Sequence, residues 1–246
     1  MARPWVTLDR VASAGGELEL RARGGREFLI TVAGRVLMTS AAHESECELA
    51  RWACEGLATQ RRPRVLISGL GMGYTLRAAL DALPQRARVR VAELEPAVVA
   101  WCRGPLAPLT GDAVADPRVD VVVGDVTDSL RAAAIGAIPR FDAVALDLFM
   151  GPRGTRAEED HPLWGGAALA LARDALAPRG ALGVWCEESA PGFAKRLARV
   201  GLSAQMRRSG RGGRRHALYL ARRVDQVRGR NGRTARRGGA EGPGTR

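Results

Sequence analysis

The chain of 246 residues lacks the long apolar segments that mark membrane-spanning and secreted proteins, and it has almost no lysine. No apolar stretch is long enough to span a bilayer, and residues 1–6 do not begin an apolar segment of signal-peptide length. Lysine is almost absent, because Lys195 is the only lysine among 38 basic residues. We therefore expect a cytoplasmic protein that has no membrane partner and whose basic side chains are nearly all arginine.

Cysteine and histidine are too few and too scattered to form a metal site or a disulfide framework. The four cysteines contain no Cys-x-x-Cys pair, and the histidines show no zinc-ligand spacing. Cys47 and Cys54 lie seven residues apart on an expected helix, which suits two small buried groups. The other members of this set are Cys102, Cys186, His43, His161 and His216. We expect no metal cofactor.

Acidic side chains are scarce only at the end of the chain. Of 38 basic and 26 acidic residues, 13 and 2 respectively follow residue 206, which leaves 25 basic and 24 acidic residues before it. Residues 223–246 are rich in glycine and arginine and nearly devoid of apolar side chains, so they cannot offset the entropy of ordering. We expect a disordered basic tail and no basic face on the body. Nucleic acid is not expected as a partner, except weakly through the tail.

What the sequence does contain is an alternation of strands and helices. The pattern predicts a mostly parallel sheet that is covered on both faces and ends in an antiparallel hairpin. Strands are expected over residues 64–68, 88–93, 119–123, 142–147, 180–185, 202–207 and 216–221, and helices over 73–83, 96–102, 126–134, 163–176 and 191–200. This α/β arrangement resembles the seven-stranded, Rossmann-like sheet of class I methyltransferases.

The amino-terminal part has a different pattern. Short apolar strands at residues 17–21, 28–32 and 36–39, separated by glycines, predict a small antiparallel β unit. Ser40 is expected to cap a helix that runs to about Gly56. The predicted organisation is an amino-terminal unit over 1–60, a Rossmann-like nucleoside-binding domain over 61–222, and the tail over 223–246.

Three alternating glycines follow the first strand of the alternating region. Gly69, Gly71 and Gly73 permit backbone angles and close approaches that a side chain would block, and a helix opens next to them. Glu93 follows twenty positions after Gly73 and ends the next strand, where its carboxylate can accept hydrogen bonds from ribose hydroxyls. This spacing predicts a nucleoside-binding crevice.

Two further carboxylates follow strands in the same way. Asp125 comes after Gly124 at the end of one strand, and Asp147 ends another. Since the carboxyl ends of parallel strands meet at one edge, we expect Glu93, Asp125 and Asp147 to be neighbours. Three alternatives stay open, namely that Glu93 is a solvated strand end, Asp125 a helix cap and Asp147 a turn residue.

These blocks together resemble those of the spermidine synthases and their bacterial relatives. The resemblance covers roughly residues 35–205 and implies a transferase of polyamine biosynthesis, which binds decarboxylated S-adenosylmethionine or S-adenosylmethionine as co-substrate. It also implies a small-molecule amine as second substrate, and a homodimer. The blocks that carry it are Val65-Leu-Ile-Ser-Gly-Leu-Gly-Met-Gly-Tyr-Thr75, Ala92-Glu-Leu-Glu-Pro96, Asp116-Pro-Arg-Val119, Gly124-Asp125 and Phe141-Asp-Ala-Val-Ala-Leu-Asp147.

The resemblance implies a role for each matching residue. Residues 69–74 take the places of the family's G-G-G-D-G-G segment around the nucleoside, so that Met72 stands where the family has its aspartate. Glu93, with Leu94 beside it, would bind the ribose, and Gly124-Asp125 would meet the adenine amino group.

Two carboxylates are assigned to the chemistry. Asp147 matches the first aspartate of the family's D-S-S-D-P segment and would accept a proton from the reacting amine, and Glu187 on a neighbouring strand end is the candidate second carboxylate. Trp185 and Trp164 could form an aromatic wall, although core packing is favoured for Trp164. Residues 158–160 are a candidate acidic lid.

The sequence also departs from the family pattern. Met72 replaces an aspartate, the second aspartate of D-S-S-D-P has no counterpart after Asp147, and the amino-terminal acidic signals are reduced to His43-Glu-Ser-Glu46. Ile67, however, occupies a position where many methyltransferases carry an acidic residue, which favours the synthase-like branch. Aminopropyl transfer, methyl transfer and nucleoside binding without catalysis therefore remain as hypotheses.

Overall fold

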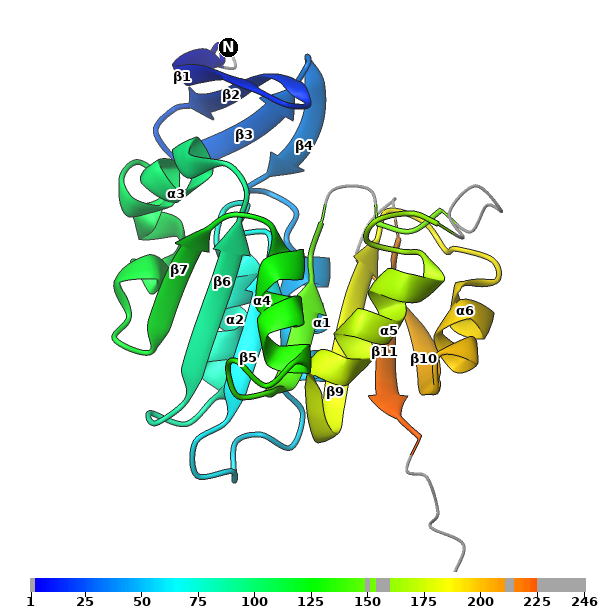
Figure 1. Ribbon diagram of the computed structural model, residues 1–246. Coiled ribbons are helices and arrows are strands. Elements are labelled where there is room, and N and C mark those ends of the chain that lie inside the picture. The colour runs from blue at the N-terminus through cyan, green and yellow to red at the C-terminus, as the bar shows by residue number, and fades with distance from the viewer. Residues whose placement is uncertain (1–2, 149–150, 154–159, 211–214, 225–246) are drawn as a thin grey trace, which may run out of the picture.

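The computed structural model describes residues 3–148, 151–153, 160–210 and 215–224. In this part of the chain, a four-stranded antiparallel sheet precedes a seven-stranded sheet with helices on both faces (Figure 1). The α/β fold with a class I methyltransferase-like sheet and a small amino-terminal β unit is thereby confirmed.

The amino-terminal sheet has one strand more than the sequence predicted. Its order is β1-β2-β3-β4, and the bounds are β1 (Val6–Ser13), β2 (Gly16–Arg23), β3 (Glu27–Val32) and β4 (Arg35–Thr39). Strand β1 was missed because nearly all of it is exposed, with Val6 and Leu8 both about half accessible, so that its pattern lacks a buried face. Pairing with β2 holds it in place.

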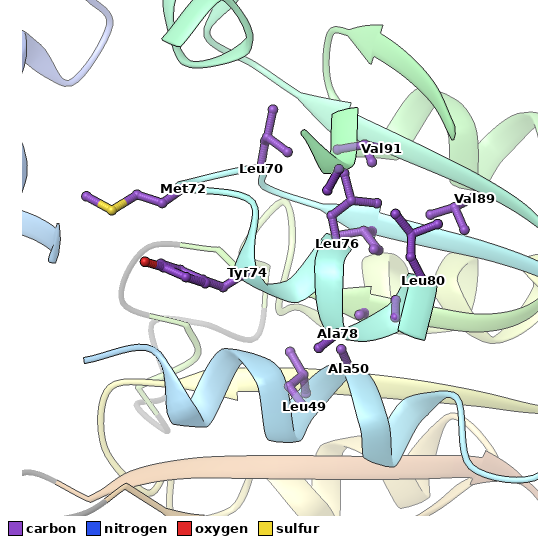
Figure 2. Packing of buried hydrophobic residues seen from close by; sticks show 14 of the residues in the cluster. Leu49, Ala50, Leu70, Met72, Tyr74, Leu76, Ala78, Leu80, Val89 and Val91 are labelled. Atoms are coloured by element: carbon purple, nitrogen blue, oxygen red, sulfur yellow. The ribbon is translucent and has the colours of Figure 1, made fainter. Parts of the chain in front are cut away.

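Helix α1 (Glu44–Ala53) begins three residues later than a cap at Ser40 predicts. The Ser40 hydroxyl does not cap it, because this hydroxyl accepts the backbone N–H of Phe28 at 2.9 Å and thereby belongs to the sheet. Leu49 and Ala50 of α1 face Ala78 of helix α2 (Figure 2). Gly183 lets α1 lie close to strand β9, since an added Cβ there would be 3.0 Å from Leu49 Cδ1.

The large sheet has the order β10-β11-β9-β8-β5-β6-β7. Strands β5 to β9 are parallel, whereas β11 is antiparallel to both of its neighbours. The bounds are β5 (Arg64–Ser68), β6 (Arg88–Glu93), β7 (Val119–Val123), β8 (Phe141–Leu146), β9 (Leu176–Cys186), β10 (Leu202–Ser209) and β11 (His216–Arg223). The order reverses between β5 and β8, and in open sheets of this kind ligands bind at such a switch point.

Helices cover the two faces of this sheet and create two buried clusters. One cluster joins residues of α1, α2, α3 and the amino-terminal sheet, and the other joins residues of α4, α5 and α6. In Figure 2, Leu76, Leu80, Val89 and Val91 of the first cluster converge between α2 and the sheet. The helix bounds are α2 (Tyr74–Ala82), α3 (Pro96–Arg103), α4 (Val126–Ala134), α5 (Gly166–Ala175) and α6 (Phe193–Arg199), with 3-10 turns at Ala107–Thr110 and Ala113–Ala115.

The amino-terminal sheet shares its core with the large sheet. Leu20 and Ile30 belong to the same buried cluster as Val65 and Val91. The division at residue 60 stays a prediction, because the core is continuous across it. Of the predicted tail, residues 225–246 lie outside the described residues.

Candidate functional site

A hollow of about 220 Å³ lies where the amino-terminal sheet meets the carboxyl ends of β5, β6 and β8. Elements from both sheets and from α1 contribute to it, so that residues far apart in the sequence share one site. Its lining consists of Leu18, Ile30, Leu37, Met38, Glu46, Gly69, Gly71, Glu93, Glu95, Val98, Asp147, Leu148 and Trp185.

The glycine turn that follows β5 allows the strand ends to approach each other. Gly69 has a φ of +84°, and a Cβ at this position would lie 2.2 Å from the carbonyl oxygen of Asp147. Gly73, also at +84°, occupies the N-cap position of α2. A residue with a side chain at Gly69 would push β5 and β8 apart, which explains the glycine in chemical terms.

Glu93 is buried at the edge of the hollow and holds the glycine turn. Its Oε2 accepts the backbone N–H of Leu70 at 2.7 Å, and its Oε1 accepts that of Glu95 at 2.9 Å. Burial raises the pKa of Glu93, while these two hydrogen bonds oppose the rise. Each carboxylate oxygen keeps a lone pair that a ribose hydroxyl can use.

Asp147 is half-buried and accepts a hydrogen bond from the hydroxyl of Thr75 on α2. Burial, and then the nearby negative charge of Glu46, raises the pKa of Asp147 to about 7. The hydrogen bond from Thr75 acts in the opposite direction. Near neutral pH the side chain can therefore both take up and release a proton.

Glu46 is a site residue to which the sequence patterns gave no role, although it ends the reduced acidic signal His43-Glu-Ser-Glu46. It is buried on α1, where Ser45 Oγ donates to its Oε2 at 2.5 Å and Trp185 Nε1 donates to Ser45 Oγ at 3.1 Å. The signal for it was helical spacing, because Glu46 precedes Leu49 by three residues and Ala50 by four, on the apolar face. A carboxylate on the buried face of a helix indicates a functional or paired charge.

The hollow is acidic and otherwise apolar. Glu46, Glu93, Glu95 and Asp147 all line it, and within the described residues no arginine, lysine or histidine does so. Taking several carboxylates out of water without a counter-charge is costly, and the raised pKa of Asp147 is the consequence. The site is thus electrostatically complementary to a cation.

Five of the predicted nucleoside-binding residues do not line this hollow, namely Met72, Gly73, Leu94, Gly124 and Asp125. Met72 is fully buried in the core, and Figure 2 shows its side chain pointing away from the cluster around Leu76. Leu94 is 61% exposed. Asp125 is exposed and caps α4 by accepting the backbone N–H of Thr127 at 2.8 Å, so the alternative of a helix cap is observed.

Asp125 is consequently not joined to Glu93 and Asp147 in one hollow, contrary to expectation. Its side chain lines a separate hollow with Arg131 and His161, among others. The ends of strands β6 and β7 are nevertheless adjacent in their main chains, since the N–H of Gly124 donates to the carbonyl of Glu93 at 2.8 Å. Asp160 lines the same separate hollow, while residues 158–159 of the predicted lid lie outside the described residues.

The structure does not bring Glu187, the candidate second carboxylate, to the hollow. It forms an ion pair with Arg35 at 3.2 Å and lines another depression together with Arg208 and Arg215. Among the aromatic candidates, Trp185 lines the acidic hollow. Trp164 is buried against Phe193 in an edge-to-face contact at 6.3 Å, as core packing predicts.

Comparisons with known proteins identify the fold. No family model matches the chain, and no curated protein matches it by sequence. The structure is similar to that of spermidine synthase from Thermotoga maritima, with a TM-score of 0.67 and 17% identity over 88% of this chain and 72% of that one.

A second solved structure is similar to the same extent. It is a spermidine synthase in complex with the transition state analogue AdoDATO, with a TM-score of 0.65 and 17% identity over 88% of this chain and 72% of that one. The two likenesses show a spermidine synthase-like fold. No helix of the described residues has the length and apolar character to cross a membrane, and no three potential metal-ligating side chains cluster there.

Substitution of Gly69 by alanine tests the close approach of the two strand ends. We expect Gly69→Ala to lower the free energy of unfolding by about 1–3 kcal/mol more than Gly136→Ala does. Gly136 has a similar φ of +81° but no atom within 4 Å of an added Cβ, so this control carries the backbone strain without the clash. Urea denaturation measures both, and equal losses would contradict the explanation.

Glu46 should contribute to the raised pKa of Asp147. In Glu46→Gln the like charge is gone, and we expect the pKa of Asp147 to fall below about 7 but to stay above its ordinary value of 3.8, because burial is the larger cause. Carbon-13 NMR titration of the carboxyl signal measures it. Glu44→Gln, at an exposed position of the same helix, is the control and should leave this pKa unchanged.

Glu46→Gln should also change how the free energy of unfolding depends on pH. Because the folded state binds the Asp147 proton more tightly than the unfolded chain does, this group's contribution to stability is complete below pH 4 and is lost as the pH rises to about 7. Glu46→Gln should reduce this loss, as denaturation at several pH values can measure. An unchanged pH dependence would mean that the two carboxylates do not interact.

Proposed function

We propose that the chain binds an adenosyl sulfonium nucleoside at the switch point of its large sheet and transfers the aminopropyl group to a small amine. The observation that carries the proposal is the acidic hollow, in which Glu46, Glu93 and Asp147 come together beside the glycine turn. Both substrates of such a transfer are cations, and both match the charge of this hollow. The fold, shared with spermidine synthases, agrees with it.

The size of the hollow limits which part of the substrates it holds. Its 220 Å³ is less than the roughly 300–1,000 Å³ usual for sites that enclose a complete small molecule. We therefore assign it the charged arm of the nucleoside and the amine. The ribose is assigned to Glu93, and the adenine to the edge between the adjacent ends of β6 and β7, where Gly124 contacts Glu93.

The reaction needs an amine without its proton. A primary amine has a pKa of about 10.4, so that fewer than about one molecule in a thousand is unprotonated at pH 7. Asp147, whose pKa is raised to about 7, is the group assigned to accept this proton. When bound, a sulfonium nucleoside supplies an activated carbon next to a neutral leaving group, so the protein contributes mainly alignment.

Glu46 and Trp185 are assigned to hold the cationic acceptor. The Trp185 indole lines the hollow and is fixed through Ser45, which also donates to Glu46. An aromatic face and a carboxylate are both attractive to an ammonium group. In this assignment Glu46 supplies the second carboxylate that Met72 and the shortened segment after Asp147 do not provide.

Methyl transfer from intact S-adenosylmethionine is the second candidate, and the charge of the hollow argues against it. Intact S-adenosylmethionine carries a carboxylate, which would lie among four acidic side chains with no basic side chain of the described residues in the lining. The decarboxylated form lacks this group. The charge of the hollow therefore favours the decarboxylated nucleoside over the intact one.

Isothermal titration calorimetry with the two sulfonium nucleosides tests the choice. We expect the decarboxylated form to bind at least about tenfold more tightly, which corresponds to about 1.4 kcal/mol. Incubation with a panel of amines, followed by mass spectrometry, should then give products heavier by one aminopropyl group. Tighter binding of the intact form together with a methylated product would establish the methyltransferase. Tight binding without turnover would support the non-catalytic hypothesis.

Asp147→Asn should abolish transfer and spare nucleoside binding. We expect kcat to fall by about 10²–10⁴-fold, because asparagine can still accept the Thr75 hydrogen bond but cannot take up a proton. In the unsubstituted protein, kcat should rise with pH and level off above about 7. Glu44→Gln is the control, and Glu187→Gln should retain turnover because its side chain is paired with Arg35. Retained turnover in Asp147→Asn would remove Asp147 from the mechanism.

A further inference from the structure

Four arginines gather at the amino ends of strands β5 and β6, which form the edge of the large sheet opposite the acidic hollow. Arg61 and Arg62 precede β5, and Arg86 and Arg88 lie at the start of β6. Together with Gln85 they line an open depression of about 620 Å³. We call these four residues the arginine edge. The two loops that carry it lie at the bottom of Figure 1.

Parallel pairing of β5 and β6 brings the arginines together. Arg64 is the register partner of Arg88, and the N–H of Arg88 donates to the carbonyl of Pro63 at 2.9 Å. Because neighbouring strands are about 4.8 Å apart, residues that precede them in the chain are close in space. The cluster is therefore a product of the fold, since its two pairs of arginines are separated by more than twenty positions in the sequence.

The four side chains are exposed and have no carboxylate partner among residues 3–148, 151–153, 160–210 and 215–224. Two carboxylates on the flanking strands are already engaged. Asp120 binds Arg90 at 2.7 Å, and Asp142 accepts the backbone N–H of Arg64 at 2.8 Å. Four unneutralised cations around one depression repel each other, and an anionic ligand would relieve this repulsion.

The geometry points to a chain of phosphates as this ligand, and we propose that the arginine edge binds the phosphodiester backbone of RNA. The planar guanidinium group matches phosphate oxygens. A single phosphate could satisfy only part of a cluster that extends over two loops. No aromatic residue lines the depression in the described part of the chain, so the binding would be insensitive to base sequence.

The carboxyl end of β11 lies at the same edge. Strand β11 is antiparallel to β9 and ends at Arg223, which places its end with the amino ends of the parallel strands (Figure 1). The sequence that follows, 225–246, holds six arginines against Asp225 and Glu241. The expectation that the basic character belongs to the tail alone is therefore corrected, because the nearly neutral body also has a basic edge.

Fluorescence polarisation with a labelled 20-nucleotide single-stranded RNA tests the proposal on the full chain. In the variant R61Q/R62Q/R86Q/R88Q we expect at least tenfold weaker binding. The slope of log affinity against log salt should fall by about 3, because each phosphate contact to a single strand contributes about 0.7. The matched control R3Q/R26Q/R103Q/K195Q removes the same charge from exposed positions elsewhere and should bind within threefold of the unsubstituted protein.

Two further experiments show whether the arginine edge or the tail binds the RNA, and whether the ligand is a nucleic acid. In the tail variant R228Q/R230Q/R233Q/R236Q, RNA binding that still depends on the arginine edge supports the proposal. Loss of binding in this variant alone, or equal losses in the cluster and control variants, would overturn it. Inorganic polyphosphate serves as competitor, and binding of polyphosphate without binding of RNA would refute the assignment to nucleic acid. All folded variants should keep their affinity for the sulfonium nucleoside, because the two sites are independent.

Discussion

The close contact between Gly69 and the carbonyl of Asp147 is the constraint on which the site depends. It lets β5 and β8 end side by side, and the N–H of Asp147 also donates to the carbonyl of Ser68 at 3.0 Å. The N–H of Gly69 donates to the carbonyl of Ala92 at 2.9 Å, which ties in the end of β6. Three strand ends are thus joined by main-chain contacts. Only with this arrangement can Glu93 and Asp147 line the same hollow.

In the proposed function, the acidic hollow supplies the negative charge that the resemblance to spermidine synthases leads us to expect from residues absent in this sequence. Met72 fills the core instead of presenting a carboxylate, and a charge enters from α1 through Glu46. Since Glu46 is buried beside Asp147, its charge is weakly screened and makes ionisation of Asp147 less favourable. Burial of Asp147, together with this charge, gives an acid that titrates near neutral pH. The same electrostatic cost makes the site receptive to a cation.

Hydrophobic patterning predicted most of the fold, because the strands β5 and β6 are mostly buried and the helix α4 buries one regular face. It failed for β1, which is exposed, and for the start of α1, where Ser40 bonds to Phe28 in the sheet. The site was predicted less well. The place of a residue at a strand end fixes where its side chain starts, but it does not fix which group the side chain contacts. Glu187 turns toward Arg35, 152 positions away, a contact without a sequence signal, whereas the capping of α4 by Asp125 was one of the alternatives that the sequence left open.

Both charged regions have a common origin in the parallel sheet. Parallel pairing gathers the carboxyl ends of β5, β6 and β8 at one edge and their amino ends at the other. Acidic residues follow the strands and arginines precede them, so that the pairing sorts the charges onto opposite edges. A count along the chain cannot reveal this, because 25 basic and 24 acidic residues before residue 207 nearly cancel. The separation is a property of topology, because it places the acidic hollow and the arginine edge at opposite ends of the same parallel strands.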